Sequence, residues 1–451
     1  MKKLFYSLAL LTLLVFQIHS TALCQSDMKE DNDASSQKSS MIKDLYSQVE
    51  LFSYALTTIQ SEYVDEKTPQ DLIYGSLKGM LSSLDPHSQF LNPEDYKELK
   101  TETQGKFGGL GIEISIRDGL LTIITPIEDT PAWKEGLKAG DRIVKIEEEL
   151  TKDITLNEAV KKLRGEPGTK ITITVFRESE YKIYNFTITR EIIEIEDVKD
   201  TQILEDNIGY IRLVEFREDS NQEVRKAMEQ LKEEGADSLI LDLRNNPGGL
   251  LDVAINITQQ FLRAGDTIVS TKGRRTSQNL ESIAKDIPGK ILDWPMVVLI
   301  NEGSASGSEI LAGALQDNRR AVILGGQSFG KGSVQSVIPL PDGSALRLTT
   351  SKYFTPSGKS IHGTGITPDI IVERKYPKLD EDEKEIKEKE EEIDKVFEDV
   401  ELQDTEDPRE LELKKREKER REYILEDNQV QSAISVIKGI KVYKKMNGPV
   451  G

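Results

Sequence analysis

The sequence predicts a multidomain protein of the α/β class, with α+β character because strand-rich and helical parts also occur separately. Between residues 208 and 325, apolar strand-like runs alternate with helical stretches, which is typical of a parallel sheet covered by helices. Residues 106–190 instead carry short β-rich runs broken by Gly, Pro and Asp, and helical periodicity recurs near both ends of the chain. A chain of 451 residues, 37% of them hydrophobic, can bury a core in each of roughly two to four domains.

The first residues have the pattern of a secretory signal. Lys2 and Lys3 precede an apolar run at 8–16 and small residues near Ala22, so we expect a signal peptide over 1–24 and an extracytoplasmic location, periplasmic or secreted. Membrane association through an uncleaved signal segment stays open.

Cys24 is the only cysteine, so no internal disulfide can form. Leu23 is bulky where lipoprotein signals carry a small residue, which favours cleavage near this point over lipid attachment. A polar flexible leader is expected over 25–41.

The remaining chain divides by its periodicity. Apolar residues three to four apart predict two helices within an N-terminal helical region, residues 42–105. The β-rich part has strand-like runs at 110–116 and 120–125 and a helix at 156–163. In the alternating part we expect strands at 208–216, 238–243, 296–300 and 322–324, and helices ending near 232, at 250–262 and at 309–315.

The formal net charge of −19 argues against a nucleic-acid partner, because phosphate binding normally needs a basic face. Much of the acidic excess lies in residues 373–451, where we expect a charged helical C-terminal extension. It either packs on the body of the protein or serves as a coiled coil or partner-binding arm. We expect no cofactor and no metal.

Residues 107–112 read Phe-Gly-Gly-Leu-Gly-Ile, a glycine-rich start of a strand. Such a loop leaves backbone N–H groups free to bind a terminal carboxylate, and the adjacent strand edge can pair with an extended peptide. Together with Gly-Leu-Lys-Ala-Gly-Asp-Arg-Ile at 136–143, this block resembles a PDZ domain over 106–190. The resemblance implies substrate-tail binding by Gly109, Leu110, Gly111 and Ile112.

A run of small residues at 301–309 separates an apolar strand from a helix, which exposes hydroxyl groups beside a helix N-terminus. An ordinary serine-rich helix cap is the alternative. Only His87 and His362 remain as histidines after the signal, both in turn-like segments, and neither is excluded as a partner. Gly-x-Ser-x-Gly is absent because Ala305 is its central residue. Lys331, between two glycines, is either a base or a surface lysine.

These motifs together are similar to those of the carboxy-terminal processing, or tail-specific, proteases. The resemblance extends from about residue 42 to Val372, with a weaker match near 427–439. It rests on Leu-Asp-Pro-His-Ser at 84–88, Asp-Leu-Arg-Asn-Asn-Pro-Gly-Gly at 242–249, Ser-Ala-Ser-Gly-Ser-Glu at 304–309, Phe-Gly-Lys-Gly-Ser-Val-Gln at 329–335, Tyr-Phe-Thr-Pro-Ser-Gly at 353–358 and Gly-Ile-Thr-Pro-Asp at 365–369.

The resemblance implies a crotonase-like α/β protease core over 191–372, with the β-rich PDZ domain inserted before it and helical N- and C-terminal segments. It also implies a Ser306 nucleophile, a Lys331 general base and a Gln335 that orients the lysine. Backbone N–H groups of Gly307 and of the turn Gly248 and Gly249 would stabilise the oxyanion. Two residues depart from the family pattern: Gly307 stands where alanine is common, and His362 where glutamine is common.

Further roles follow from the same resemblance. Asp242 and Arg244 would buttress the oxyanion turn, although an ordinary surface pair is the alternative. Arg164 would couple the two domains through an ion pair, with a locally bonded turn arginine as the alternative. Lys331 has an ordinary pKa of about 10.4, so burial must lower this pKa if it is to act as a base near neutral pH.

The function predicted from these residues is a secreted serine endopeptidase that recognises free, apolar protein C-termini through its PDZ domain and cleaves near them by a Ser-Lys acyl-enzyme route. A homodimer and an adaptor protein are open possibilities. An inert PDZ scaffold and a different hydrolase or lyase on the crotonase-like fold are the rival interpretations.

Overall fold

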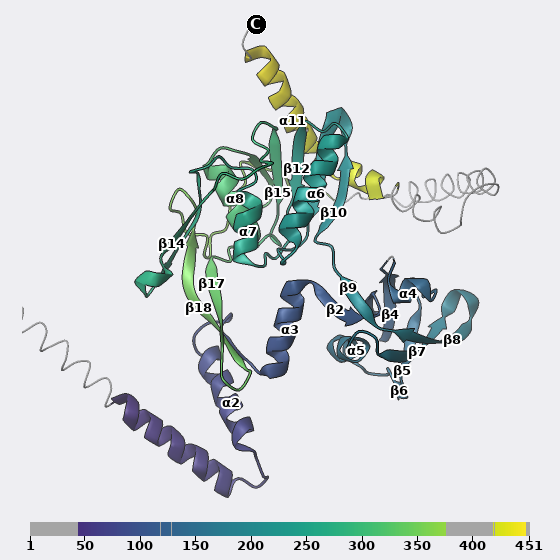
Figure 1. Ribbon diagram of the computed structural model, residues 1–451, viewed down its shortest axis with the longest axis vertical. Coiled ribbons are helices and arrows are strands. Elements are labelled where there is room, and N and C mark those ends of the chain that lie inside the picture. The colour runs from purple at the N-terminus through teal and green to yellow at the C-terminus, as the bar shows by residue number, and fades with distance from the viewer. Residues whose placement is uncertain (1–43, 118, 128, 376–417, 419, 448–451) are drawn as a thin grey trace, which may run out of the picture. The chain divides into compact units, whose positions relative to one another are not determined.

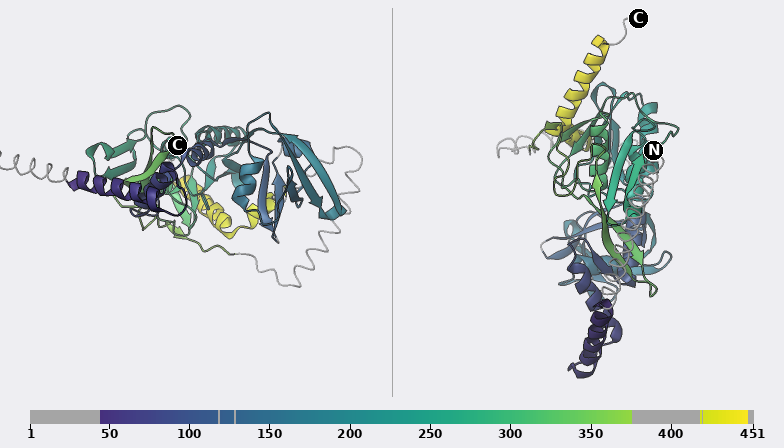
Figure 2. Two further views of the ribbon diagram at one scale, coloured as in Figure 1. Left: turned by 90° about the horizontal axis from the view of Figure 1, so that it is seen from below. Right: turned by 90° about the vertical axis from the view of Figure 1, so that its left-hand side faces the viewer.

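The computed structural model describes residues 44–117, 119–127, 129–375, 418 and 420–447 (Figures 1 and 2). The chain forms two compact units, residues 1–90 and 91–451. The predicted signal peptide, the leader, Cys24 and most of the charged segment before residue 418 lie outside the described residues. The observed mixture of helices and sheets confirms the predicted α/β multidomain class.

The first unit contains the two predicted helices, residues 44–62 and α2 (Pro69–Ser82). Thr68 caps α2 by accepting a hydrogen bond from the backbone N–H of Asp71, and Pro69 follows at the first helical position. Past α2, the Asp85 carboxylate accepts the N–H groups of His87 and Ser88, so His87 lies in an Asx-type turn. β1 (Gln89–Leu91) follows at the boundary of the unit.

The second unit begins with a helix that the sequence analysis did not predict, α3 (Pro93–Gln104). Asn92 caps its N-terminus, and Gly105, at φ 69°, ends it in the left-handed conformation. A two-stranded ribbon follows, in which β2 (Lys106–Gly109) pairs antiparallel with β9 (Glu191–Glu194).

Between those two strands the chain forms a β-rich body with the sheet order β3-β4-β5-β7-β8. Its strands are β3 (Ile112–Arg117), β4 (Leu120–Pro126), β5 (Arg142–Ile146), β6 (Glu149–Leu150, paired with β5), β7 (Lys170–Arg177) and β8 (Lys182–Thr189). Its helices are α4 (Pro131–Lys134) and α5 (Leu156–Leu163). Ala159 and Leu163 of α5 are buried against the sheet in one apolar core, as the amphipathic spacing predicts.

A second sheet, of order β10-β11-β12-β15-β16-β19, is the centre of the core domain. It comprises β10 (Val198–Ile203), β11 (Ile208–Leu213), β12 (Ser238–Asp242), β15 (Met296–Ile300), β16 (Val322–Gly325) and β19 (Ile370–Ile371). All neighbours are parallel except the β10–β11 pair. The helices α6 (Ser220–Glu233), α7 (Leu251–Thr258) and α8 (Gly307–Asp317) lie in the crossovers between these strands.

Helices cover both faces of this sheet. Successive strand residues point to opposite sides, so neighbouring residues of one strand pack in different cores. Leu239 and Leu241 of β12 pack in the core with α6, α7 and α8, whereas Ile240 packs on the other side with α11 (Asn428–Asn447). The described end of the C-terminal extension therefore packs on the body of the protein. The last turns of α11 extend past the sheet, where Tyr443 and Met446 are exposed (Figure 2).

A further antiparallel sheet was missed by the sequence analysis. β18 (Ala345–Phe354) pairs with both β17 (Ser333–Pro339) and β13 (Thr267–Gly273), and β13 pairs with β14 (Leu280–Ile283). These strands carry many polar residues, and both faces are partly exposed, so the alternation that identifies a buried strand is weak. No helix among the described residues is long and apolar enough to cross a membrane.

Candidate active site

Ser306 lies at the carboxyl end of β15, in the loop that leads into α8. It is the N-cap residue of α8 and has φ 52° and ψ −108°, a backbone conformation that non-glycine residues rarely adopt. The following residue, Gly307, is the first of the helix, so its N–H group has no partner within the helix. This geometry places a hydroxyl beside a free N–H donor.

The predicted oxyanion turn lies against Ser306, because β12 and β15 are adjacent parallel strands whose carboxyl ends share one edge. The Asn246 carbonyl accepts hydrogen bonds from Ala305 N–H at 3.0 Å and from Ser308 Oγ at 2.9 Å. A Cβ added to Gly248, at φ 101°, would lie 2.8 Å from Ser306 Cβ. Only glycine permits so close an approach.

The predicted donors of this turn are not equivalent. Gly248 N–H already donates to Asn246 Oδ1 at 2.9 Å, so in this structure it is not available to an oxyanion, contrary to the prediction. Gly249 N–H donates none of the turn and loop hydrogen bonds. On either side of it, the Gly248 carbonyl accepts from Phe216 N–H and Leu250 N–H donates to the Phe216 carbonyl. Gly249 and Gly307 are therefore the predicted donors left without a partner.

Lys331 lies in the loop between β16 and β17, and this loop is tied to the Ser306 loop by Glu309. The Glu309 side chain is fully buried and accepts four hydrogen bonds. The donors are Ser306 N at 2.9 Å, Lys331 N at 2.9 Å, Gly330 N at 2.7 Å and Ser328 Oγ at 2.6 Å. Burial raises the pKa of the Glu309 carboxyl, and these hydrogen bonds oppose the rise.

Glu309 ends the Ser-Ala-Ser-Gly-Ser-Glu motif at 304–309, but no role was predicted for its side chain. The signal was present, since a serine followed three residues later by glutamate is the pattern of a capping box.

The environment of Lys331 lowers the pKa of its side chain below the ordinary lysine value. Partial burial lowers the pKa of Lys331, the nearby Arg347 lowers it further, and Glu309 opposes both. Ser306 Oγ and Lys331 Nζ are not hydrogen-bonded to each other in the part of the chain that the structure describes. Such catalytic hydrogen bonds often tighten only when a substrate is bound.

Gln335 has a different partner from the one predicted. Its Oε1 accepts two hydrogen bonds from Arg347, from Nε at 3.1 Å and from Nη2 at 2.9 Å, whereas its buried Nε2 has no partner. No hydrogen bond from Gln335 to Lys331 is formed. Arg347, on β18, was missed because strand pairing alone brings it opposite β17.

The two histidines that follow the predicted signal lie in different parts of the chain. His87 belongs to the turn of the first unit described above. His362 is exposed, although its backbone is close to the lysine loop: a Cβ at Gly332 would lie 2.1 Å from His362 N.

The glycine-rich loop of the β-rich body has the features expected of a carboxylate site. Gly111, at φ 78°, accepts hydrogen bonds through its carbonyl from Ile127 N–H and Thr130 Oγ1. The N–H groups of Leu110 and Gly111 donate none of the turn and loop hydrogen bonds. β3, which starts at Ile112, is the edge strand of its sheet, so its outer edge can accept a peptide strand.

Arg164 does not form the predicted ion pair with any described residue. It ends α5, and its guanidinium carbon lies 4.2 Å from the ring centroid of Phe107, over the face of the ring. This is a cation–π contact between the end of α5 and β2. The partner of Arg164 is therefore the aromatic ring of Phe107, in place of the acidic residue that an ion pair would need.

Asp242 and Arg244 are a buried pair and not the surface pair that was the alternative. Arg244 Nε and Nη2 donate to the Asp242 carboxylate, the latter at 2.6 Å, and Tyr210 OH donates to the same carboxylate at 2.7 Å. Burial opposes ionisation of Asp242, but Arg244 holds the pKa of Asp242 below its ordinary value.

Comparison with family models agrees with this fold. Residues 207–372 match the model of peptidase family S41, residues 122–177 match a PDZ domain, and residues 11–95 match the activating protease CtpB N-terminal domain. The class that these matches define is a peptidase with a PDZ domain.

Similar proteins of known family narrow the class of peptidase to which this chain belongs. The chain is 48% identical over 337 residues to a carboxy-terminal-processing protease of Bartonella bacilliformis, covering 74% of this chain and 76% of the relative. It is 41% identical over 307 residues to a carboxyl-terminal-processing protease of Synechocystis, covering 67% and 71%. It is also similar to a solved photosystem II D1 C-terminal processing protease, at 29% identity and TM-score 0.42, covering 71% and 86%. This chain belongs to peptidase family S41, as a carboxy-terminal processing serine protease with a PDZ domain.

Proposed function

We propose that this protease is a secreted endopeptidase that binds the free C-terminus of a protein substrate and cleaves near it with a Ser306-Lys331 pair. The observation that carries the mechanism is the meeting of three loops: the Ser306 loop, the Gly248–Gly249 turn packed against it, and the Lys331 loop joined to it through Glu309. The basic and apolar N-terminal pattern is the basis for secretion.

In the proposed reaction, neutral Lys331 takes the proton of Ser306, and the resulting alkoxide attacks the substrate carbonyl. The tetrahedral oxyanion receives hydrogen bonds from the N–H groups of Gly307 and Gly249. Lys331 then gives its proton to the leaving amine, and water hydrolyses the acyl-enzyme by the same route. Gln335, whose side-chain oxygen is held by Arg347, orients the Lys331 amine in this proposal without adding a charge that would keep the proton on the lysine.

The PDZ part supplies substrate choice in this proposal. The free N–H groups of Leu110 and Gly111 bind the terminal carboxylate, and the substrate tail pairs with the open edge of β3. Ile112 and Ile114 of that strand are partly buried beside α5, which favours apolar tails.

The proposal is tested with a peptide that ends in a free, apolar C-terminus and is read by mass spectrometry. Ser306→Ala should abolish cleavage while the melting temperature stays near that of the wild type. Ser304→Ala and Ser308→Ala are matched controls that should keep partial activity, since their hydroxyls bond to the Leu243 and Asn246 carbonyls. Full inactivation by Ser304→Ala in a folded protein, with cleavage kept in Ser306→Ala, would show that the nucleophile has been misplaced.

A further inference from the structure

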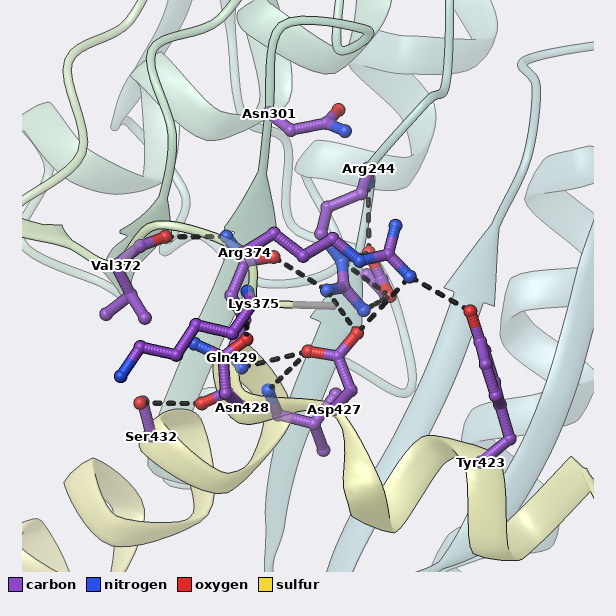
Figure 3. Close-up of polar contacts among 12 residues, drawn as sticks. Arg244, Asn301, Val372, Arg374, Lys375, Tyr423, Asp427, Asn428, Gln429 and Ser432 are labelled. Atoms are coloured by element: carbon purple, nitrogen blue, oxygen red, sulfur yellow. Dashed lines mark hydrogen bonds and ion pairs between the residues drawn. The ribbon is translucent and has the colours of Figure 1, made fainter. Parts of the chain in front are cut away.

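The C-terminal segment contacts the residue that precedes the oxyanion turn. Arg244 Nη1 donates to Asp427 Oδ2 at 2.8 Å and to Gln429 Oε1 at 2.7 Å (Figure 3). Both acceptors come just before or at the start of α11, far along the chain from Arg244. The guanidinium is thus held between β12, through Asp242, and the C-terminal segment.

Arg244 and its two acceptors in the C-terminal segment, Asp427 and Gln429, are buried. The side chains of Arg244 and Asp427 are 8% and 7% exposed, and Gln429 is 2% exposed as a residue. A buried guanidinium needs acceptors for its donors, because an unsatisfied buried charge is strongly destabilising. Asp427 and Gln429 are the described acceptors of Nη1, so the orientation of the Arg244 side chain depends on them.

Arg244 is directly joined to the oxyanion turn. Its own N–H donates to Asp242 Oδ1 at 2.9 Å, and the next residue, Asn245, has φ 59°. From there the turn leads to Asn246, whose carbonyl is bonded to the Ser306 loop, and to Gly248. The turn is therefore fixed on one side by the Ser306 loop and on the other by Arg244.

The C-terminal segment is itself held firmly. Gln429 Nε2 donates to the Val372 carbonyl at 2.7 Å, and Asn428 bonds both the Glu373 carbonyl and Lys375 N–H at 2.9 Å (Figure 3). The apolar side of α11 then packs on the sheet through the buried residues Val430, Ala433, Ile434 and Ile437. A rigid attachment of this kind can impose a position on Arg244.

We propose that Asp427 and Gln429 are positioning residues of the active site, which set the oxyanion turn by holding Arg244. This inference rests on the proposed function of that turn. The C-terminal segment is then part of the catalytic apparatus and not only a cover for the sheet. Removing the charge of Asp427 or the acceptor of Gln429 lets the turn shift relative to Ser306, and a displacement of about 1 Å can lower a rate by roughly a hundredfold.

The test compares Asp427→Asn and Gln429→Met with two controls on the same helix, in the full-length chain. Lys438→Met removes the ion pairs of α11 with Glu205 and Asp206, and Ile434→Val trims its buried face, but neither touches Arg244. For each variant, kcat and KM for peptide cleavage are measured together with the melting temperature. Asp427→Asn and Gln429→Met should lower kcat by about tenfold to a hundredfold with KM changed less than about twofold. Both controls should keep kcat at any comparable loss of melting temperature.

A double-mutant cycle separates positioning from general stability. In an Arg244→Met background, Asp427→Asn should have little further effect on kcat, because the residue through which it acts is gone. If Arg244→Met does not fold, the single variants and their controls decide the matter. Wild-type kcat in folded Asp427→Asn and Gln429→Met, or an equal kcat loss in the two controls, overturns the proposal. Cleavage that survives Ser306→Ala would instead overturn the proposed function, so the two failures are distinguishable.

Discussion

Ser306 and Lys331 donate their backbone N–H groups to the same oxygen, Oε2 of Glu309, each at 2.9 Å. The other oxygen of Glu309 accepts Ser328 Oγ and Gly330 N–H. One buried carboxylate thereby sets the spacing of the two loops that carry the proposed nucleophile and base.

Glu309→Gln should therefore lower both stability and activity, although it preserves the shape of the side chain. All four partners are donors, so the new NH₂ group would face N–H or O–H groups, and each buried donor left unsatisfied costs about 1 to 3 kcal/mol. We expect a lower melting temperature and a cleavage rate reduced at least about tenfold. Glu302→Gln, an exposed neighbour, is the control. Wild-type kinetics in Glu309→Gln would contradict the role given to this carboxylate.

Substitution of Lys331 tests its basicity. Lys331→Ala should lower the rate by about a hundredfold to ten-thousandfold, the usual contribution of a general base. Lys331→Arg should fail similarly, because arginine keeps the charge but does not release a proton in the working pH range. A variant lacking both His87 and His362 should retain most of the chemistry. Near-normal turnover of Lys331→Arg, or loss of turnover with the histidines alone, would refute the Ser-Lys mechanism.

The pH dependence of the cleavage rate should be sensitive to Arg347 as well as to Lys331. In the proposed mechanism the neutral amine is the active form, so the cleavage rate should rise with pH through the pKa of Lys331. Burial and Arg347 both lower this pKa, so the rise comes at lower pH than for an ordinary lysine. Arg347→Met removes the second effect and should move the rise to higher pH, whereas Arg347→Lys should largely keep its position. An unmoved pH profile in the folded methionine variant would exclude this electrostatic role.

Binding of the substrate tail should depend on Gly111 and on a free carboxylate. At φ 78°, an added Cβ would lie 2.2 Å from Thr130 Cβ, so Gly111→Ala must distort the loop. Strain of this kind costs about 1 to 3 kcal/mol, which predicts binding weaker by about fivefold to 150-fold. Fluorescence anisotropy with the Ser306→Ala chain measures this without cleavage. Gly168→Ala, at φ 87° with no atom within 4 Å, is the matched control.

C-terminal amidation of the same peptide should weaken binding to a similar degree, because it removes the negatively charged carboxylate to which the loop N–H groups would donate. Equal affinity for the acid and the amide would remove the support for tail recognition.

The sequence predicted helices and strands best where a single hydrophobic pattern, helical or strand-like, dominated the segment. The strands at 238–242 and 296–300 are fully buried and have apolar centres, and α5 was predicted with its observed bounds, because such patterns depend on few neighbours. β13, β14, β17 and β18 were missed because their burial is partial and their pairing is non-local. The catalytic roles predicted for Ser306, Lys331 and Gln335 rest on motif resemblance, not on periodicity, and they stay predictions.

By itself, the sequence determined the α/β class, the family and the short motifs, since these depend on residue identity and local spacing. Only the tertiary structure decided which groups meet: Arg347 with Gln335, Arg164 with Phe107, and Arg244 with Asp427 and Gln429. Such contacts join distant parts of the chain, and their partners follow from strand order and from which sheet face a helix covers. Hydrogen bonds and ion pairs are decided within a few tenths of an ångström, a precision that only the packed fold supplies.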